Sequence, residues 1–292
     1  MQWLTIIGIG EDGPDGLGDA AKAVIAGAAT VFGGARHLEL AASLLTGEGH
    51  VWLSPFERSV DEIVARRGQP VVVLASGDPF FFGVGATLSR RIDPSEMRVM
   101  PAPSSFSLAA SRLGWPLQDV ACVSLHGRPL DLIRPHLQPG CRVLALTSDS
   151  DGPSALAALL TENGFGQSRL TVLEALGGPQ ERVTHHVADA FGSDVFHSLN
   201  VCGVEIVAGE GARILPLAPG LDDSLFEHDG QITKREARAL TLSALSPRRG
   251  ELLWDIGGGS GSIAIEWMLR DPAMRAIAIE QSPERAARIR RN

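Results

Sequence analysis

The chain has 292 residues, enough for about two domains, and 44% of them are hydrophobic. No apolar run approaches the ~18 residues of a membrane span and no basic leader precedes an apolar one, so we expect a soluble, cytoplasmic protein without a membrane partner. The formal net charge of −8 disfavours a nucleic-acid partner, because phosphate binding usually shows as a basic excess.

The N-terminal segment begins with an apolar strand, Trp3 to Gly10, followed by a literal G-x-G-x-x-G at Gly8, Gly10 and Gly13. In a dinucleotide site, this turn leads directly into a helix and an acidic residue follows the next strand. Here Pro14 delays the helix to about residues 19–28, and the strand at 30–32 ends in two glycines. The motif therefore fails the context tests of a dinucleotide site.

A second loop with functional character follows the apolar strand 70–75. Before this strand, the segment 59–62 predicts a capping box for a helix that ends near Arg67. The loop Ser76 to Gly83 comes at the carboxyl end of the strand 70–75, where open sheets bind ligands. Within it, Asp78 and Pro79 are equally typical of a plain Asx turn. The three phenylalanines 80–82 fit either a pocket wall or core packing.

The next segments predict further alternation of strands and helices. Ser104 and Ser105 open a helix that Gly114 ends, and later apolar runs predict strands at 120–125, 142–147, 170–176, 183–187 and 204–208, with a helix at 154–163. The pattern predicts an α/β fold with a largely parallel sheet. We expect no metal site, because the histidines lack metal-ligand spacing, and no disulfides, because the three cysteines are widely separated.

A second glycine turn lies near the C-terminus. The strand Leu252 to Ile256 runs into Gly257-Gly258-Gly259-Ser260-Gly261, a helix from Ser262 follows, and the next apolar run ends at Glu280. Glycines let the backbone approach a ligand, and Glu280 is placed to accept ribose hydroxyls. Ser282 and Pro283 predict a helix N-cap with proline at the first helical position, which explains the neighbourhood of Glu280 without a ligand. The spacing resembles that of methyltransferases that use S-adenosyl-L-methionine. A nicotinamide enzyme and a turn without ligand are the alternatives at this point.

Several motifs in order resemble one family. The set comprises Gly8–Gly10, Ala75–Pro79, Ala102–Pro116 and Leu125–Pro129. It is similar to the tetrapyrrole methylases of cobalamin biosynthesis, and the similarity covers residues 1–210. Residues 228–240 are similar to the start of the partner methyltransferase that acts at carbon 15 and removes a carboxyl group.

The resemblance implies a domain organisation. Residues 1–210 would form the tetrapyrrole methylase fold, in which two α/β halves, about 1–115 and 116–210, enclose a cofactor cleft. Residues 211–226 would be a linker. Residues 227–292 would be the start of a Rossmann-like methyltransferase domain, since typical domains have about 100–150 residues. We therefore expect this part to be incomplete and less well ordered than residues 1–210.

The resemblance also implies the activity and its residues. The expected reaction is S-adenosyl-L-methionine-dependent methylation of the tetrapyrrole precorrin-6Y at carbons 5 and 15, with decarboxylation of the ring C acetate; this chain would retain only the carbon-5 step. Expected cofactor contacts are Gly77, Asp78, Pro79, Ser104, Ser105, His126, Gly127, Thr233, Gly257, Gly258, Gly259, Ser260, Gly261 and Glu280. Lys234 is a candidate to hold a substrate carboxylate. Thr233 also begins a capping box for a helix whose expected apolar face is Ala237, Leu240, Thr241, Ala244 and Leu245.

The expected chemistry needs positioning more than a catalytic group, because the methyl donor is already an activated electrophile. We therefore expect no covalent intermediate and no single indispensable base in the first domain. The family resemblance also implies self-association into a homo-oligomer. Three alternatives remain: a ribosomal RNA methyltransferase of the same fold type, an NAD-dependent oxidoreductase, and a non-catalytic remnant that only binds cofactor.

Overall fold

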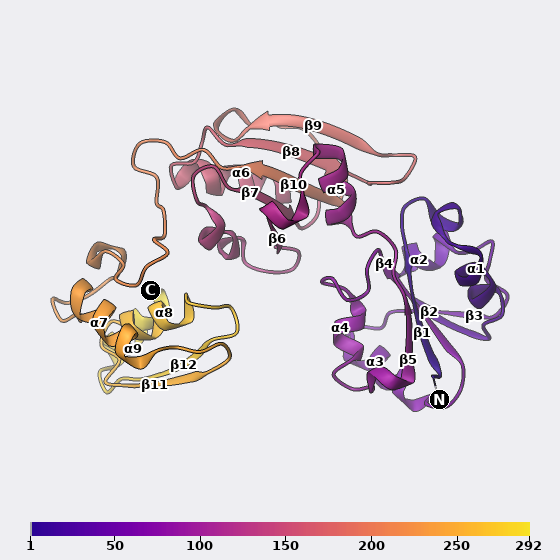
Figure 1. The fold of residues 1–292 in the computed structure, drawn as a ribbon, viewed down its shortest axis with the longest axis horizontal. Helices are drawn as coiled ribbons and strands as arrows, with labels where there is room; N and C mark the ends of the chain where they lie inside the picture. Colours follow the sequence, from indigo (N-terminus) through magenta and orange to yellow (C-terminus); the bar gives the residue numbers. More distant parts are fainter. Residues whose placement is uncertain (1) are drawn as a thin grey trace. The chain divides into compact units, whose positions relative to one another are not determined.

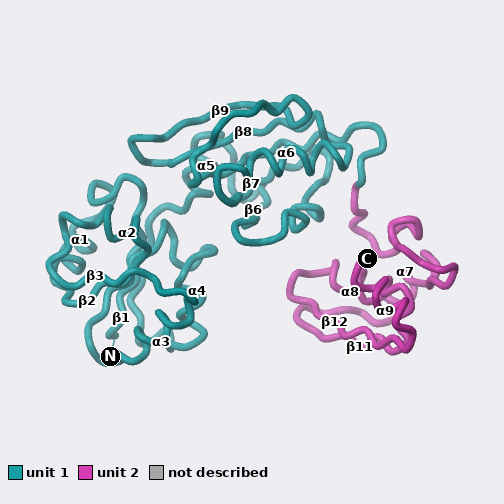
Figure 2. Tube along the Cα trace, turned by 180° about the vertical axis from the view of Figure 1, so that it is seen from behind, with its two compact units in different colours: residues 1–213 teal, residues 214–292 magenta. Residues whose placement is uncertain are grey.

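The computed structural model describes residues 2–292, which form two compact units (Figures 1 and 2). Unit 1 extends to Arg213, and unit 2 comprises Ile214–Asn292. Unit 1 contains two separate sheets, and unit 2 contains one small sheet. Each unit has its own hydrophobic core.

The first sheet of unit 1 is fully parallel, with strand order β3-β2-β4-β1-β5. Its strands are β1 (Leu4–Ile9), β2 (Thr30–Gly33), β3 (Glu48–Val51), β4 (Val71–Ser76) and β5 (Met97–Met100). Helices α1 (Asp19–Ala26) and α2 (Ala35–Leu40) pack on one face, and α3 (Glu57–Ala65) and α4 (Val84–Leu88) pack on the other. Because both faces are covered, the central strands β1 and β4 are almost continuously apolar.

The second sheet of unit 1 has the order β6-β7-β10-β8-β9. Its strands are β6 (Val120–Ser124), β7 (Arg142–Leu146), β8 (Arg169–Glu174), β9 (Arg182–Val187) and β10 (Asn200–Glu205). Only β6 and β7 pair in parallel, and the other three pairs are antiparallel. Helix α5 (Ser105–Leu113) covers one face and α6 (Gly152–Glu162) covers the other. The prediction of a largely parallel sheet is therefore wrong for this half, because the alternation of strands and helices does not encode how β10 inserts between β7 and β8.

Unit 2 contains a parallel pair of strands and three helices. These are β11 (Leu252–Ile256), β12 (Arg275–Ile279), α7 (Arg235–Leu245), α8 (Ser262–Met268) and α9 (Pro283–Arg291). Leu253 and Ala276 on one face of the sheet pack against a core of Leu242, Trp267 and Met274. On the other face, five apolar side chains are 41–78% exposed, namely Leu252, Trp254, Ile256, Ile277 and Ile279. Parallel sheets normally bury both faces, so this exposure is unusual.

Short 3-10 helices connect the elements: η1 (Gly13–Gly16), η2 (Pro94–Glu96), η3 (Leu117–Asp119), η4 (Leu130–His136), η5 (Ala188–Ala190) and η6 (Asp223–Leu225). Two predicted helix starts are confirmed. Ser104 Oγ accepts a hydrogen bond from the Ser107 amide at 3.1 Å, and Ser282 caps α9 with Pro283 at its first position.

Both predicted capping boxes are wrong. Helix α3 begins at Glu57, so Ser59 lies inside it and its hydroxyl accepts from the Leu53 amide at 2.7 Å. Helix α7 begins at Arg235 after Lys234, and no side chain caps it. The predictions failed because each sequence pattern lies next to the true helix start rather than at it.

Candidate functional site

Three backbone segments approach one another closely at the carboxyl edge of the first sheet. A Cβ atom on Gly8 would lie 1.9 Å from the Gly77 carbonyl oxygen and 2.6 Å from the Ala102 nitrogen. Gly77 has φ +52°, and a Cβ atom there would lie 2.8 Å from the Pro103 oxygen. The first glycine of the G-x-G-x-x-G therefore permits the β1, β4 and β5 ends to pack together.

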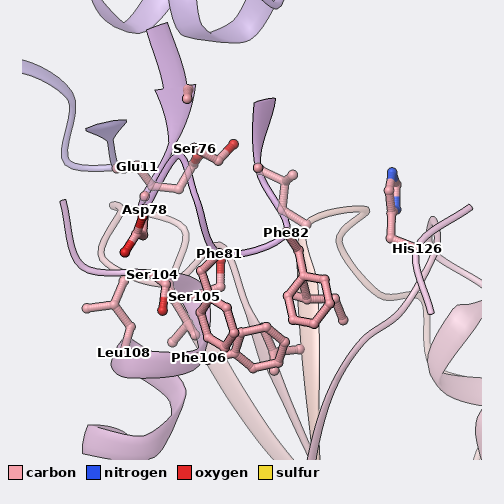
Figure 3. Close-up of a pocket in the computed structure, with 18 of the residues that line it drawn as sticks. Glu11, Ser76, Asp78, Phe81, Phe82, Ser104, Ser105, Phe106, Leu108 and His126 are labelled. Atoms are coloured by element: carbon pink, nitrogen blue, oxygen red, sulfur yellow. The ribbon is translucent and has the colours of Figure 1, made fainter. Parts of the chain in front are cut away.

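A cavity of about 350 Å³ opens at this edge, within unit 1, and residues of both α/β halves line it (Figure 3). Its size is typical of small-molecule sites. Five predicted cofactor contacts are among its lining residues: Gly77, Asp78, Ser104, Ser105 and His126.

Two other predicted contacts, Pro79 and Gly127, are not among the described residues that line the cavity. Pro79 is buried, and its carbonyl accepts a hydrogen bond from the Gly85 amide at 2.9 Å. Gly127 has φ +66°, and its amide donates to Ser148 Oγ at 2.8 Å. Both residues shape the loops that carry their neighbours to the cavity.

Two of the polar residues that line the cavity, Asp78 and Ser104, also form hydrogen bonds within their own loop or helix. Asp78 Oδ1 accepts from the Phe80 amide at 2.8 Å, which is the Asx turn expected of an Asp-Pro pair. Ser104 caps α5, so the start of this helix lies at the cavity with Ser105 beside it. A helix start presents unpaired amides that favour polar or anionic ligand groups.

Three aromatic side chains, Phe81, Phe82 and Phe106, form an aromatic wall of the cavity. The Phe81 and Phe82 rings lie 5.0 and 5.8 Å from the Phe106 ring, and Figure 3 shows the three rings together, with His126 across from them. Phe82 has the left-handed φ of +58°, and its ring lies 5.9 Å from the guanidinium carbon of Arg128. An apolar wall next to a cation suits a flat ligand that carries carboxylates.

The sequence reasoning missed a polar cluster on the same cavity, formed by Glu11, Arg36, His37 and Ser76. His37 Nε2 lies 2.8 Å from Ser76 Oγ, Arg36 Nη2 lies 3.1 Å from each of these atoms, and Arg36 pairs with Glu11. Burial, and then the charge of Arg36, lowers the pKa of His37 to about 4. The cluster joins the loop after β1, helix α2 and the end of β4, which are far apart in the sequence, and only the parallel order of β1, β2 and β4 brings them together.

The predicted glycine turn in unit 2 has the conformation that requires glycine. Gly257, Gly259 and Gly261 have φ values of +86°, +56° and +78°. The Gly257 and Gly258 amides donate to the Ile279 carbonyl at 2.8 and 3.0 Å, which fixes the turn against the end of β12.

Glu280 lies at this turn, as its position after β12 implied. Its carboxylate accepts from the Ser282 amide at 2.9 Å and from the Gly259 amide at 2.8 Å, and these bonds lower its pKa. Next to the turn, Asp255 Oδ2 is buried without a hydrogen-bond partner among the described residues, and burial raises the Asp255 pKa. Glu280 therefore holds the shape of the loop, and Asp255 leaves a polar atom unsatisfied beside it.

Ser260, in the same turn, is buried, and its carbonyl accepts a hydrogen bond from the Asn292 side chain at 2.8 Å. The other two candidates of unit 2 lie before α7. Thr233 is exposed, and its carbonyl accepts a hydrogen bond from the Arg238 guanidinium. Lys234 is also exposed, and its ammonium lies 3.4 Å from Asp223. Within residues 2–292, no group of three or more His, Cys, Asp or Glu side chains is arranged to hold a metal ion. In the same range no helix is long and apolar enough to cross a membrane.

Comparisons with known proteins cover both units. Residues 3–191 match the family model of the tetrapyrrole (corrin/porphyrin) methylases, and residues 224–292 match that of a precorrin methyltransferase domain. A precorrin-6Y C(5,15)-methyltransferase [decarboxylating] from Sinorhizobium sp is 74% identical over 290 residues, which is 99% of this chain and 70% of the relative.

Two further matches concern the first unit. A cobalt-precorrin-7 C(5)-methyltransferase from Salmonella typhimurium is 30% identical over 180 residues, 62% of this chain and 88% of the relative. The solved uroporphyrin-III C-methyltransferase of Thermus thermophilus, complexed with S-adenosylhomocysteine, has a TM-score of 0.55 at 22% identity, covering 71% of this chain and 97% of that chain. The second likeness concerns the fold alone. The chain belongs to the tetrapyrrole methylases and, within them, to the precorrin-6Y C(5,15)-methyltransferases, enzymes of cobalamin biosynthesis.

Proposed function

We propose that unit 1 binds S-adenosyl-L-methionine in its cavity and methylates carbon 5 of the tetrapyrrole there. The observation that carries this proposal is the cavity itself, which gathers the Gly77-Asp78 loop, the Ser104-Ser105 helix start and His126 of the second half. The likeness to a carbon-5 methyltransferase, which covers 62% of this chain, supports the choice of carbon 5. The complex of the Thermus thermophilus neighbour with S-adenosylhomocysteine supports the choice of cofactor.

The residues of the cavity would act by positioning. The cofactor supplies a methyl group on a sulfonium, which needs no activation by the protein. The Ser104-Ser105 helix start and the Gly77-Asp78 loop offer backbone amides and short polar groups for its polar ends. The wall of Phe81, Phe82 and Phe106 would offer a flat apolar surface for the macrocycle. Alignment alone can lower such a barrier by about 7–11 kcal/mol.

Two serine variants on one helix test the cofactor site. Ser105 lines the cavity and Ser111 is exposed on the same α5, so the change Ser→Trp is chemically matched at the two positions. We expect Ser105→Trp to weaken S-adenosylhomocysteine binding at least tenfold by isothermal titration calorimetry, because the indole fills the cavity. Ser111→Trp should bind like the wild type. Equal binding by both variants would place the cofactor elsewhere.

For unit 2, we propose a second cofactor site at the glycine turn, with Gly257 to Gly261, Glu280 and Thr233 as contacts and Lys234 as a holder of a substrate carboxylate. The organisation would be a methylase domain at 1–210, a linker at 211–226 and a second methyltransferase part at 227–292. The match of residues 224–292 to a precorrin methyltransferase domain supports this division. The unsatisfied Asp255 Oδ2 beside the turn supports a polar ligand there.

We propose that this 292-residue chain carries out only the carbon-5 step. The support is the exposed apolar face of the β11–β12 sheet, where Trp254 is 60% and Ile256 78% exposed. A sheet solvated on an apolar face opens at low free energy, which disfavours a precise catalytic site. Hydrogen exchange of the full chain tests this: amides of β11 and β12 should exchange at least tenfold faster than those of β1 and β4. Equal protection would contradict it.

We also propose that the chain acts in the cytoplasm on a small molecule and not on a nucleic acid. The net charge of −8 supports a small-molecule partner without nucleic acid, and retention on heparin would argue against this. The cysteines Cys122, Cys141 and Cys202 are all free thiols, which supports a reducing cytoplasm. We further propose a homo-oligomer, by analogy with the family. Light scattering of the purified chain at several concentrations would decide its state.

A further inference from the structure

A pair formed by Ser76 and His37 stands apart from the groups assigned to the cofactor. Ser76 ends β4, His37 lies in α2, and both line the cavity of unit 1. Ser76 Oγ is 2.8 Å from His37 Nε2. Arg36 contacts both atoms at 3.1 Å and is itself held by Glu11. Figure 3 shows Ser76 and Glu11 on the same side of the cavity as Asp78.

The hydrogen-bond chemistry fixes the roles of this pair. A guanidinium only donates, so His37 Nε2 next to Arg36 is an acceptor, and neutral His37 carries its proton on Nδ1. The Ser76 hydroxyl can then donate to Nε2 and accept from Arg36. One lone pair of Ser76 Oγ remains for a proton arriving from the cavity.

His37 is neutral at physiological pH. Burial is the main cause of its lowered pKa, and Arg36 is the second. The strands β2 and β4 beside α2 carry no titratable side chain, and the two on β3, Glu48 and His50, lie 3.6 Å from each other. Glu11 and Asp78 are the carboxylates on the adjoining loops, and Glu11 pairs with Arg36.

The reaction proposed for this cavity must release a proton. When a methine carbon is methylated, the electron pair of the methyl–sulfur bond stays on sulfur and a pair from the macrocycle forms the new carbon–carbon bond. The macrocycle is then cationic. It becomes neutral when the same carbon loses its hydrogen as a proton and the C–H electron pair returns to the ring. A group in the cavity that accepts this proton removes the positive charge from the product.

We propose that the Ser76 hydroxyl accepts this proton and passes its own to His37 Nε2, so that the pair acts as the proton acceptor of the methylation. The inference rests on the proposed function of the cavity. A weak base is adequate for so acidic a cation, and methylation still proceeds without the pair, at a lower rate. The pair therefore adds to positioning and does not replace it.

A nucleophilic serine is the competing role for such a pair. It requires a third group that orients the histidine through Nδ1. Among the described residues, His37 Nδ1 is buried without a hydrogen-bond partner, and Arg36 shares Nε2 with the serine. The arrangement lacks the orienting carboxylate of a triad, so Ser76 relays a proton and does not attack the substrate.

Four variants of the pair and one control variant, all in the full chain, test the proposal. His37→Asn and Ser76→Ala should each lower kcat about 100-fold, within the usual range for a general base, while S-adenosylhomocysteine affinity stays within twofold of wild type. The double variant should be no slower than either single variant, because the residues act as a unit. Ser76→Thr keeps the hydroxyl and should remain within threefold of wild type. His185→Asn, on the second sheet, should behave like wild type, because the His185 side chain bonds to Thr171 and is not among the described residues that line the cavity.

The measurements distinguish a failure of the Ser76–His37 proposal from a failure of the proposed function of the cavity. If wild-type protein neither binds S-adenosylhomocysteine nor methylates the tetrapyrrole, the proposed function fails. If the wild type is active and His37→Asn keeps the wild-type kcat, the proposed role of the pair as proton acceptor is overturned. Added imidazole should partly restore kcat of His37→Asn, which a purely structural role would not allow. Should His37→Asn not fold, Ser76→Ala alone decides, since Ser76 is exposed and its loss leaves the core intact.

Discussion

Arg238 and Glu266 form an ion pair in which both side chains are completely buried in unit 2. Arg238 Nε lies 2.7 Å from Glu266 Oε1, and the guanidinium also contacts Asp223 at 2.7 Å. The Glu266 carboxylate accepts from the Gly220 and Leu221 amides at 2.6 and 2.9 Å. The pair thereby joins α7, α8 and the segment before η6.

Breaking this pair should destabilise unit 2 strongly. Arg238→Met leaves the Glu266 charge buried without its cation, which should lower the free energy of unfolding by about 3–5 kcal/mol. Urea unfolding of the full chain, followed by tryptophan fluorescence, measures the change, since Trp254 and Trp267 report on this unit. Arg235→Met on the same helix is the control, because Arg235 is exposed, and it should cost less than about 0.5 kcal/mol. A similar effect of the two changes would contradict this account.

The contact between Gly8 and Gly77 predicts the effect of a single methyl group. Gly8→Ala places a Cβ atom 1.9 Å from the Gly77 oxygen, so β1 and the Gly77 loop must separate. We expect a stability loss of about 1–3 kcal/mol and at least tenfold weaker binding of S-adenosylhomocysteine. Gly18→Ala is the matched control, because a Cβ atom there meets nothing within 4 Å. Wild-type binding by Gly8→Ala would show that the loop position is not critical.

A comparison of alanine variants at Phe82 and its neighbour Phe80 distinguishes loss of a ring contact with the macrocycle from a general effect on the loop. Phe82 lines the cavity, whereas Phe80 does not, although their exposed fractions are 45% and 46%. Phe82→Ala should raise KM for the tetrapyrrole about tenfold, equivalent to ~1.4 kcal/mol of ring contact, and leave cofactor affinity unchanged. Phe80→Ala should leave both constants near wild type. If Phe80→Ala raised KM as much as Phe82→Ala, a general effect on the loop would replace the ring contact.

His37 should make unit 1 sensitive to acid. Its pKa is about 4 in the folded chain and near 6.5 when unfolded, so the unfolded chain binds more protons between these values. The free energy of unfolding therefore falls as the pH falls from about 6.5 to 4, by of the order of 3 kcal/mol from this group. Urea unfolding at pH 7 and pH 4.5 should show a smaller loss for His37→Asn than for wild type. Equal losses would mean that His37 is protonated readily in the folded chain.

The sequence predicted those parts of the fold that short-range patterns encode. Continuous apolar runs located β1, β4 and β11, and caps whose hydroxyl bonds to the third following amide located α5 and α9. Strand β3 was missed because Glu48–Val51 has no apolar pattern, and α2 was missed because it starts after Gly34 without a side-chain cap.

The other predictions failed because they depend on contacts between residues that are far apart in the sequence. The apolar face expected for α7 included Leu240, which is 73% exposed, while the buried positions are Arg238 and Leu242. A pattern rule treats arginine as a surface residue, yet Glu266 from α8 makes its burial possible. The Ser76–His37 pair escaped for the same reason, since its two residues meet only through the order of the sheet. The positions of Gly77, Ser104 and His126 on one cavity accord with the motif-based expectation, and their contacts with a ligand stay a prediction.

The central claim is that unit 1 of this chain methylates carbon 5 in its own cavity. Mass spectrometry of precorrin substrate incubated with the chain and methyl-labelled S-adenosyl-L-methionine tests this most directly, combined with capture of released carbon dioxide and location of the label by NMR. We predict one labelled methyl group per tetrapyrrole, at carbon 5, without carbon dioxide release, and loss of this product in Ser105→Trp but not in Ser111→Trp. Label at carbon 15 with carbon dioxide release, or label that persists in Ser105→Trp, would contradict the account.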